Sequence, residues 1–267
     1  GSSSCGGQAT AYYGEVLEAI ATKSQEERSA KFIYSQTFIG SGGSYLRDNF
    51  DIAVKLGWAR ESVLPSYPAT EEFLTRREDI RLETLDDASS AKALSYASVD
   101  LNIDSVAQAV ANNYGAVILI QGENNGTWTS AYPNVGKAEW NHFMYVCKAK
   151  LIDGKKYLGC MNSWGVNVGL DGWQWISEDF FTQKRILEVR TLVYKDKPTQ
   201  FKFNKNLYWG MKNGDVLQLQ ARLGVLQTGL FWTLTFNAVR KFQKEHGISQ
   251  TGFVGEKTRA KLNALSV

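Results

Sequence analysis

The sequence predicts an α+β unit followed by a small helical unit. Apolar residues recur at helical spacing near the start of the chain, and two alternating runs flank an Asp-Gly pair further along. A 23-residue repeat occupies the last part of the chain. Helices that precede strands in this way are typical of an α+β domain.

The helices are expected first. Helical spacing predicts one over residues 5–22, with an apolar face formed by Ala9, Tyr13, Val16, Leu17 and Ile20. Ser3 or Ser4 is its expected N-cap. Further helices are expected near residues 45–57, after a glycine turn at Gly42 and Gly43, and near 104–113.

The strands follow. "GAVILIQG" is a continuous apolar run bounded by glycine, as expected of a buried strand. "NHFMYVCKAKLIDGKKYLGCMNSWG" predicts a hairpin that turns at Asp153-Gly154, and "DGWQWISEDFF" predicts one more strand. On the first strand of the hairpin, Lys148 and Lys150 are expected to face solvent. The residues expected to share its core face are Phe143, Tyr145, Cys147, Ala149 and Leu151.

The hairpin turn also predicts the register of two cysteines. With a two-residue loop, Cys147 and Cys160 lie directly opposite each other on the core face. They are then either two buried thiols or a cross-strand disulfide. Disulfides with such short loops are often strained, which favours the thiols.

A second unit is expected after a polar, basic linker, "VYKDKPTQFKFNKN". The boundary falls near residues 197–204, giving units at 1–197 and 205–267. Thr228 and Thr251 open two similar segments that repeat after 23 residues. The second unit is predicted to form three short helices.

Charge divides the chain in the same place. Residues 201–267 carry ten Lys and Arg against three Asp and Glu, a net charge of +7, which leaves −4 for residues 1–200. A basic tail suits an anionic polymer such as nucleic acid or bacterial wall, although a solvated basic face is the simpler explanation. No nucleic-acid motif accompanies it, so no nucleic acid is expected as a partner. No apolar run approaches the roughly 18 residues of a membrane span.

The candidate chemistry rests on Cys5, His142 and Asn162. A thiol at a helix start is favoured as thiolate, and His142 is the one histidine in residues 1–200 that could act as its base. Asn162 could then orient the imidazole, with Trp164 covering that hydrogen bond. The sequence has no CxxC or HxxxH zinc spacing, so neither a metal nor a cofactor is expected.

Several motifs resemble the papain-like cysteine peptidases. Cys5 precedes His142 by 137 residues and His142 precedes Asn162 by 20, as in that family. "NSWG", "GLDGWQWI", "NHFMYV" and "GGSYLRDNFDIAVKLG" look like the segments around its Asn, its His and its substrate cleft. The resemblance implies a helical lobe and a β lobe. It also implies catalysis by Cys5, His142 and Asn162, and a substrate cleft that includes Gly42, Gly43, Asn141 and Trp164.

The segment "SSCGGQA" fits that family in two registers. In the favoured one, Cys5 is the nucleophile and Gly6 replaces the usual aromatic residue. In the other, Cys5 matches an upstream structural cysteine, Gln8 takes the nucleophile position and the protein is inactive. The family's oxyanion-hole Gln would fall before Gly1, so we expect the natural protein to extend upstream and to carry its secretion signal there.

The C-terminal part resembles the three-helix peptidoglycan-binding domain of bacterial and phage wall enzymes. The match rests on "AVRKFQ" and on the repeated "TG…T" segments, and Trp232 departs from it by replacing a usual glycine. Together the resemblances predict a monomeric cysteine endopeptidase that acts on peptides or proteins, outside the cell or on its wall. The alternative is an inactive papain-like protein that only binds cell wall.

Overall fold

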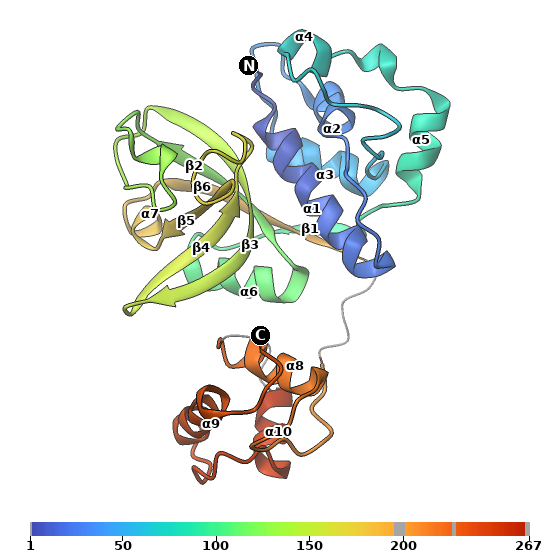
Figure 1. Cartoon of the computed structure of the whole chain (residues 1–267). Helices are drawn as coiled ribbons and strands as arrows, with labels where there is room; N and C mark the ends of the chain where they lie inside the picture. Colours follow the sequence, from blue (N-terminus) through green and yellow to red (C-terminus); the bar gives the residue numbers. More distant parts are fainter. Residues whose placement is uncertain (1, 195–200, 226–227, 265–267) are drawn as a thin grey trace. The chain divides into compact units, whose positions relative to one another are not determined.

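The chain folds into two compact units, Gly1–Asp196 and Lys197–Val267, in a computed structural model (Figure 1). The structure describes residues 2–194, 201–225 and 228–264. Six of the fourteen residues of the predicted linker, including Pro198, lie outside these described residues. Each unit has its own hydrophobic core, as expected of separate domains.

Helices dominate the first half of the first unit. They are α1 (Cys5–Thr22), α2 (Ala30–Thr37), α3 (Leu46–Lys55), α4 (Glu71–Leu74), η1 (Arg77–Asp79), α5 (Leu82–Ser89) and, later, α6 (Ile103–Asn113), η2 (Thr127–Thr129) and α7 (Asp179–Thr182). Three of these lie where helical spacing predicted them, and Ser4 is the N-cap of α1. Helix α2 was not predicted, because seven of its eight residues are buried and an apolar stripe is therefore missing.

Six antiparallel strands form one sheet in the order β1-β6-β2-β3-β4-β5. They are β1 (Ser95–Ser98), β2 (Ala116–Gly122), β3 (Trp140–Ile152), β4 (Lys155–Met161), β5 (Trp173–Ser177) and β6 (Ile186–Val193). Sequence analysis did not identify β1 or β6. The α+β prediction is confirmed, with a helical half on one side of the sheet and α6 against the other (Figure 1).

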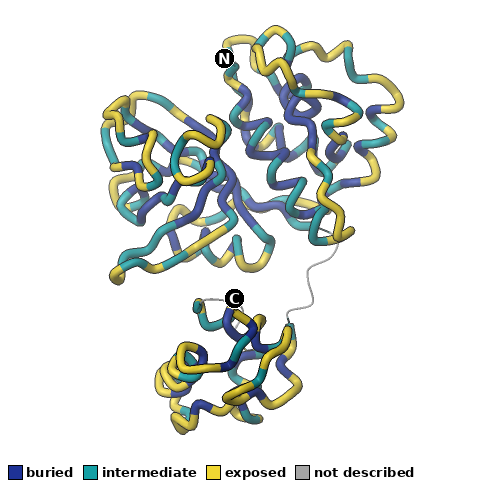
Figure 2. The backbone as a smooth tube through the Cα atoms, viewed as in Figure 1, coloured by how far each residue is buried: buried dark blue, intermediate teal, exposed yellow. Residues whose placement is uncertain are grey.

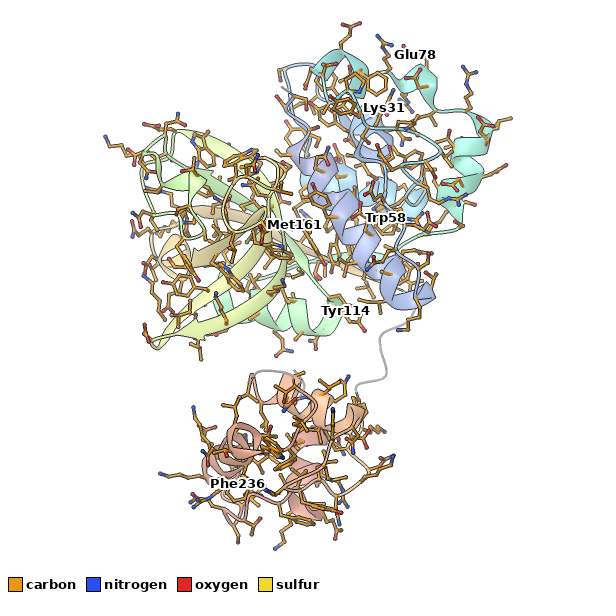
Figure 3. The ribbon with its side chains drawn as sticks, in the orientation of Figure 1. Lys31, Trp58, Glu78, Tyr114, Met161 and Phe236 are labelled. Carbon is orange, nitrogen blue, oxygen red and sulfur yellow. The ribbon has the colours of Figure 1, made fainter. Side chains whose placement is uncertain are left out.

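Helix α1 joins the helical half to the sheet. Its Tyr13 is fully buried, donates a hydrogen bond to the carbonyl of Gly115 before β2 (2.6 Å) and accepts one from the N–H of Leu192 in β6 (3.3 Å). On the helical side, the buried Trp58 donates its indole N–H to the carbonyl of Thr10 (3.1 Å). Figure 2 shows buried stretches along α1 and the sheet, and Figure 3 labels Trp58 behind α1. The start of α1 is therefore held firmly against the sheet.

The β3–β4 hairpin forms as predicted near its turn and departs from the prediction further in. Asp153 and Gly154 both have positive φ (49° and 80°), and the pairs from Lys148↔Gly159 to Ile152↔Lys155 follow the expected register. A bulge at Cys147 then shifts the pairing, so Val146, not Cys147, pairs with Cys160.

The bulge also overturns the predicted faces of the hairpin. Ala149 and Leu151 were expected in the core but are exposed, because an extra residue in a strand reverses the alternation beyond it. Lys148 is exposed, as predicted, and lies over the ring of Trp173 (3.6 Å), whereas Lys150 is half-buried and lies over the ring of Trp175 (3.4 Å). The two cysteines pack on opposite faces of the sheet, and both are free thiols.

The second unit contains α8 (Gly214–Arg222), α9 (Thr233–Glu245) and α10 (Glu256–Ala264). Its repeat has a structural cause, since Gln220 and Gln243 lie 23 residues apart and form matching hydrogen bonds. Gln220 receives the N–H of Gly229 (2.8 Å) and donates to the carbonyl of Leu230 (2.9 Å). Gln243 repeats this with the residues 23 positions later, Gly252 (2.9 Å) and Phe253 (2.9 Å).

No helix among the described residues combines the length and the apolar character that a membrane span requires.

Candidate active site

Six of the seven predicted site residues line one cleft of the first unit. The cleft has a volume of about 770 Å³. These six residues are Cys5, Gly42, Gly43, Asn141, His142 and Trp164. The seventh, Asn162, is buried (4% exposed) and contacts His142 from behind. The structure therefore brings together residues that are up to 159 positions apart in the sequence.

Cys5 is the first residue of α1 and is half-buried. Burial raises the pKa of its thiol, hydrogen bonds from the backbone N–H groups of Phe143 and Gly6 lower that pKa in part, and the charge of Glu71 raises it. The sulfur therefore lies beside the N–H of Phe143, the residue that follows His142. The same helix start leaves the first N–H groups of α1 without intrahelical partners.

His142 lies on β3 opposite Ile120 and is only 5% exposed. Burial lowers the pKa of its imidazole to about 4, and its hydrogen bond with Asn162 acts in the opposite direction. Nε2 of His142 is 2.8 Å from Oδ1 of Asn162. At neutral pH this histidine is therefore uncharged.

A chain of hydrogen bonds determines which ring nitrogen of His142 carries the proton. Gln174 donates its amide group to the carbonyls of Trp128 (2.6 Å) and Ser130 (3.2 Å), so its oxygen faces Asn162. That oxygen accepts the amide N–H of Asn162 (2.6 Å), which leaves Oδ1 of Asn162 as an acceptor toward His142. Nε2 of His142 therefore carries the hydrogen, and Nδ1 keeps the lone pair of a base.

Trp164 covers this hydrogen bond. Its ring stacks on the imidazole of His142 with 4.6 Å between centroids and a 27° interplanar angle. Trp128 and Trp140 pack edge-on against Trp164 (6.0 and 5.8 Å). Because Trp164 is 42% exposed, it shields the imidazole on the solvent side of the cleft.

The opposite wall contains the glycine pair. Gly42 and Gly43 have φ values of 100° and 82°, a conformation that side chains rarely adopt, and they let a ligand backbone approach closely. Gly43 donates its N–H to the hydroxyl of Tyr34 (3.0 Å), which donates to Glu71 (2.6 Å). Glu71 also accepts the N–H of Ser3 (2.7 Å), two residues before Cys5.

Two further residues considered from the sequence, Asn141 and Gln8, also lie at the cleft. Asn141 is exposed at the cleft and accepts a hydrogen bond from Gln121 (3.3 Å). Gln8, the nucleophile position of the second register, also lines the cleft. Among the described residues, no hydrogen bond joins the side chain of Gln8 to His142.

The predicted site did not include Gln174, Tyr34, Glu71 or Glu188. Gln174 had a visible signal, since it is a polar residue between two tryptophans in a strand, at the position that faces inward. Among the described residues that line the cleft, Glu188 alone is an acid or a basic Lys or Arg, and it pairs with Arg190 (2.5 Å). Tyr34 and Glu71 carried no local signal, because their partners lie far along the chain.

The described residues contain no group of three or more His, Cys, Asp or Glu side chains that could hold a metal ion. The chemically active groups of the cleft, among its described lining residues, include the thiol of Cys5, the imidazole of His142 and the carboxylate of Glu188.

Comparison with solved structures identifies the fold of the first unit. Xylellain, a cysteine protease from Xylella fastidiosa, matches with a TM-score of 0.60 and 22% identity over 72% of this chain and 80% of that chain. The bromelain protease from Ananas comosus, in complex with the E64 inhibitor, matches with a TM-score of 0.59 and 20% identity, over 73% of this chain and 90% of that chain. The proform of the ragweed pollen allergen Amb a 11, a cysteine protease, matches with a TM-score of 0.60 and 20% identity, over 72% of this chain and 59% of that chain.

A search of curated protein sequences gave no match. Residues 212–262 match the family model described as a putative peptidoglycan binding domain. The chain thus combines the fold of the papain-like cysteine proteases with a C-terminal peptidoglycan-binding domain.

Proposed function

We propose that residues 1–197 form a cysteine endopeptidase and that residues 205–267 hold it on bacterial cell wall, outside the cell. One observation carries the first part of the proposal. The Cys5 sulfur lies beside the N–H of Phe143, and the adjacent His142 has its Nε2 hydrogen fixed by Asn162. Cys5 and His142 line one cleft and Asn162 bonds the imidazole from behind, which supports their roles as nucleophile, base and the group that orients the base.

The reaction follows from these groups. Nδ1 of His142 takes the proton of the Cys5 thiol as the sulfur attacks the peptide carbonyl, and the carbonyl oxygen becomes an oxyanion. The backbone N–H of Cys5, at the start of α1, is suited to donate to that oxyanion. His142 then gives the proton to the leaving amine, and a thioester forms.

Water completes the cycle. It loses a proton to Nδ1 of His142 and attacks the thioester, which releases the acid, and the proton returns to the Cys5 sulfur. Throughout these steps the Nε2–H of His142 keeps its hydrogen bond to Oδ1 of Asn162. Burial favours the neutral thiol and the neutral imidazole, so we expect the proton to move during attack and the resting pair to be uncharged.

The two registers of the N-terminal motif make opposite predictions for Cys5 and Gln8. We expect Cys5→Ala to abolish both labelling by an epoxide inhibitor of the E64 type and casein hydrolysis, and Gln8→Ala to retain both. Burial raises the pKa of Cys147 to about 11 and that of Cys160 well above its usual range, so mass mapping should find the label on Cys5. Absence of label on a folded protein would support the inactive alternative.

The wall-binding part has its own test. The family match at residues 212–262 and the net charge of +7 in residues 201–267 support binding to an anionic wall polymer. The full chain should sediment with purified peptidoglycan sacculi. We expect Cys5→Ala to sediment equally well, because binding and cleavage are assigned to different units.

A further inference from the structure

Aromatic side chains gather on one part of the second unit. Tyr208, Trp209 and Phe253 are 52%, 53% and 40% exposed, which is unusual for large rings. Two of them precede residue 212, where the family match begins. Large exposed apolar side chains that lie together mark interaction sites more often than scattered ones do.

Contacts join these rings. Tyr208 stacks on Phe253 with 6.2 Å between centroids and a 20° angle, and Trp209 packs edge-on against Phe236 at 5.7 Å. Phe236 in turn lies against Gly252, where an added Cβ would come within 2.1 Å of its ring. We call Tyr208, Trp209, Phe236 and Phe253 the aromatic surface; Figure 3 labels Phe236.

The backbone beneath the aromatic surface is fixed. Leu207 and Val254 are fully buried and exchange two backbone hydrogen bonds (2.9 and 3.3 Å), which sets Tyr208 directly opposite Phe253. Gln243 holds the backbone of Gly252 and Phe253 from inside. A surface that is ordered before binding loses little entropy when a ligand arrives.

The repeat shows that the glutamine contact at Phe253 does not require an aromatic ring. The counterpart of Phe253, 23 residues earlier, is Leu230, whose carbonyl accepts the same hydrogen bond from Gln220. The glutamine contact therefore requires only a backbone carbonyl at this position. The ring of Phe253 is free for another role.

We infer that the aromatic surface binds the sugar backbone of peptidoglycan, an inference that rests on the proposed wall-binding function. Sugar rings have an apolar C–H face that packs on an exposed aromatic ring, while their hydroxyl groups stay in water. Arg240 lies over Phe236 (6.0 Å), in a region of net charge +7 that suits the carboxylates of the attached peptides. Single-stranded nucleic acid is the other polymer that such chemistry accommodates, but the family match favours peptidoglycan.

The test uses the full chain with Cys5→Ala, so that sacculi are not cleaved. Phe253→Leu copies the counterpart residue of the first repeat, and Trp209→Ala removes a second ring. Sedimentation with sacculi should weaken about fivefold for each variant and further for the pair. Leu234→Ala is the matched control. Leu234 is 52% exposed on α9, and because it lies two residues before Phe236 its side chain faces away from the Phe236 ring.

Competitors identify the bound part of the wall. An oligomer of four N-acetylglucosamine units should displace the chain from sacculi, and a free stem tetrapeptide should not. Displacement by the peptide alone, stronger binding to single-stranded oligonucleotide, or unchanged binding of folded ring variants would each overturn the inference. Unchanged binding of the ring variants would leave the proposed wall-binding function intact. Failure of the Cys5→Ala chain with an unaltered aromatic surface to bind sacculi would overturn both the wall-binding function and this inference.

Discussion

The two walls of the cleft are held in place by different means. The histidine wall, formed by His142, Asn162, Gln174 and Trp164, is a chain of buried side chains that ends on backbone carbonyls of the β half. The cysteine wall consists of Cys5, Gly43, Tyr34 and Glu71. There the backbone N–H of Gly43 is tied to the Glu71 carboxylate through the hydroxyl of Tyr34, and the N–H of Ser3 donates to the same carboxylate directly.

This difference separates two tasks. In the histidine wall, the partners of His142 carry no charge and fix which ring nitrogen holds the proton, and burial lowers the pKa of His142 to about 4. The cysteine wall fixes the position of backbone groups; there burial raises the pKa of the Cys5 thiol, and the charge of Glu71 raises it further. The histidine side thus orients its ring through neutral hydrogen bonds, whereas the cysteine side adds a nearby charge to the effect of burial.

The largest effect expected from the histidine wall is on stability in acid. The pKa of His142 is about 4 in the folded protein against 6.5 when unperturbed, so the unfolded chain binds an extra proton between these pH values. His142 should therefore cost about 3 kcal/mol of folding free energy as pH falls from 6.5 to 4, and nothing above 6.5. Urea unfolding across this range measures the effect.

A control is needed, because burial raises the pKa of Glu15 to about 7, which acts with the opposite sign between pH 4.5 and 7. The relevant quantity is the difference between the unaltered chain and His142→Gln. If both lose stability equally on acidification, the imidazole is not held neutral by burial.

The next largest effect concerns Asn162. Asn162→Ala leaves Nε2 of His142 and the oxygen of Gln174 without their partner, so the imidazole can turn and the other tautomer becomes accessible. We expect kcat/KM to fall roughly 100-fold, mostly through kcat, and unfolding free energy to fall by about 1–3 kcal/mol. Unchanged kcat in a folded variant would show that Asn162 does not orient the base.

Gln174 should have a smaller effect of the same kind. Gln174→Leu leaves Asn162 in place but removes the acceptor of its amide N–H, so the amide group of Asn162 can flip. We therefore expect roughly tenfold lower kcat with little change in KM. Gln174→Glu keeps an acceptor for Asn162 and should recover part of the loss. A purely structural role for Gln174 would lower stability in both variants without a selective loss of kcat.

Local patterns predicted some of this site and left the rest unseen. Asp153-Gly154 predicted the hairpin that carries Asn162, because two residues with positive φ suffice to reverse a strand. The bulge at Cys147 depends on packing of both sheet faces, so no local pattern announced it. Gln243 could have been found from the repeat, since Gln220 precedes it by 23 residues. Glu71 could not, because its partner Ser3 is 68 residues away.

The smallest effect expected is on the cysteine wall. Glu71→Gln removes the charge that raises the pKa of Cys5 and keeps a side chain able to accept from Tyr34 and Ser3. The thiol should therefore ionise at lower pH, and its alkylation by iodoacetamide at pH 7 should speed up by less than about tenfold. Tyr34→Phe is the matched control, since it releases the N–H of Gly43 but leaves the carboxylate. It should impair substrate binding without the faster alkylation; equal acceleration in both variants would assign the effect to loosened packing and not to charge.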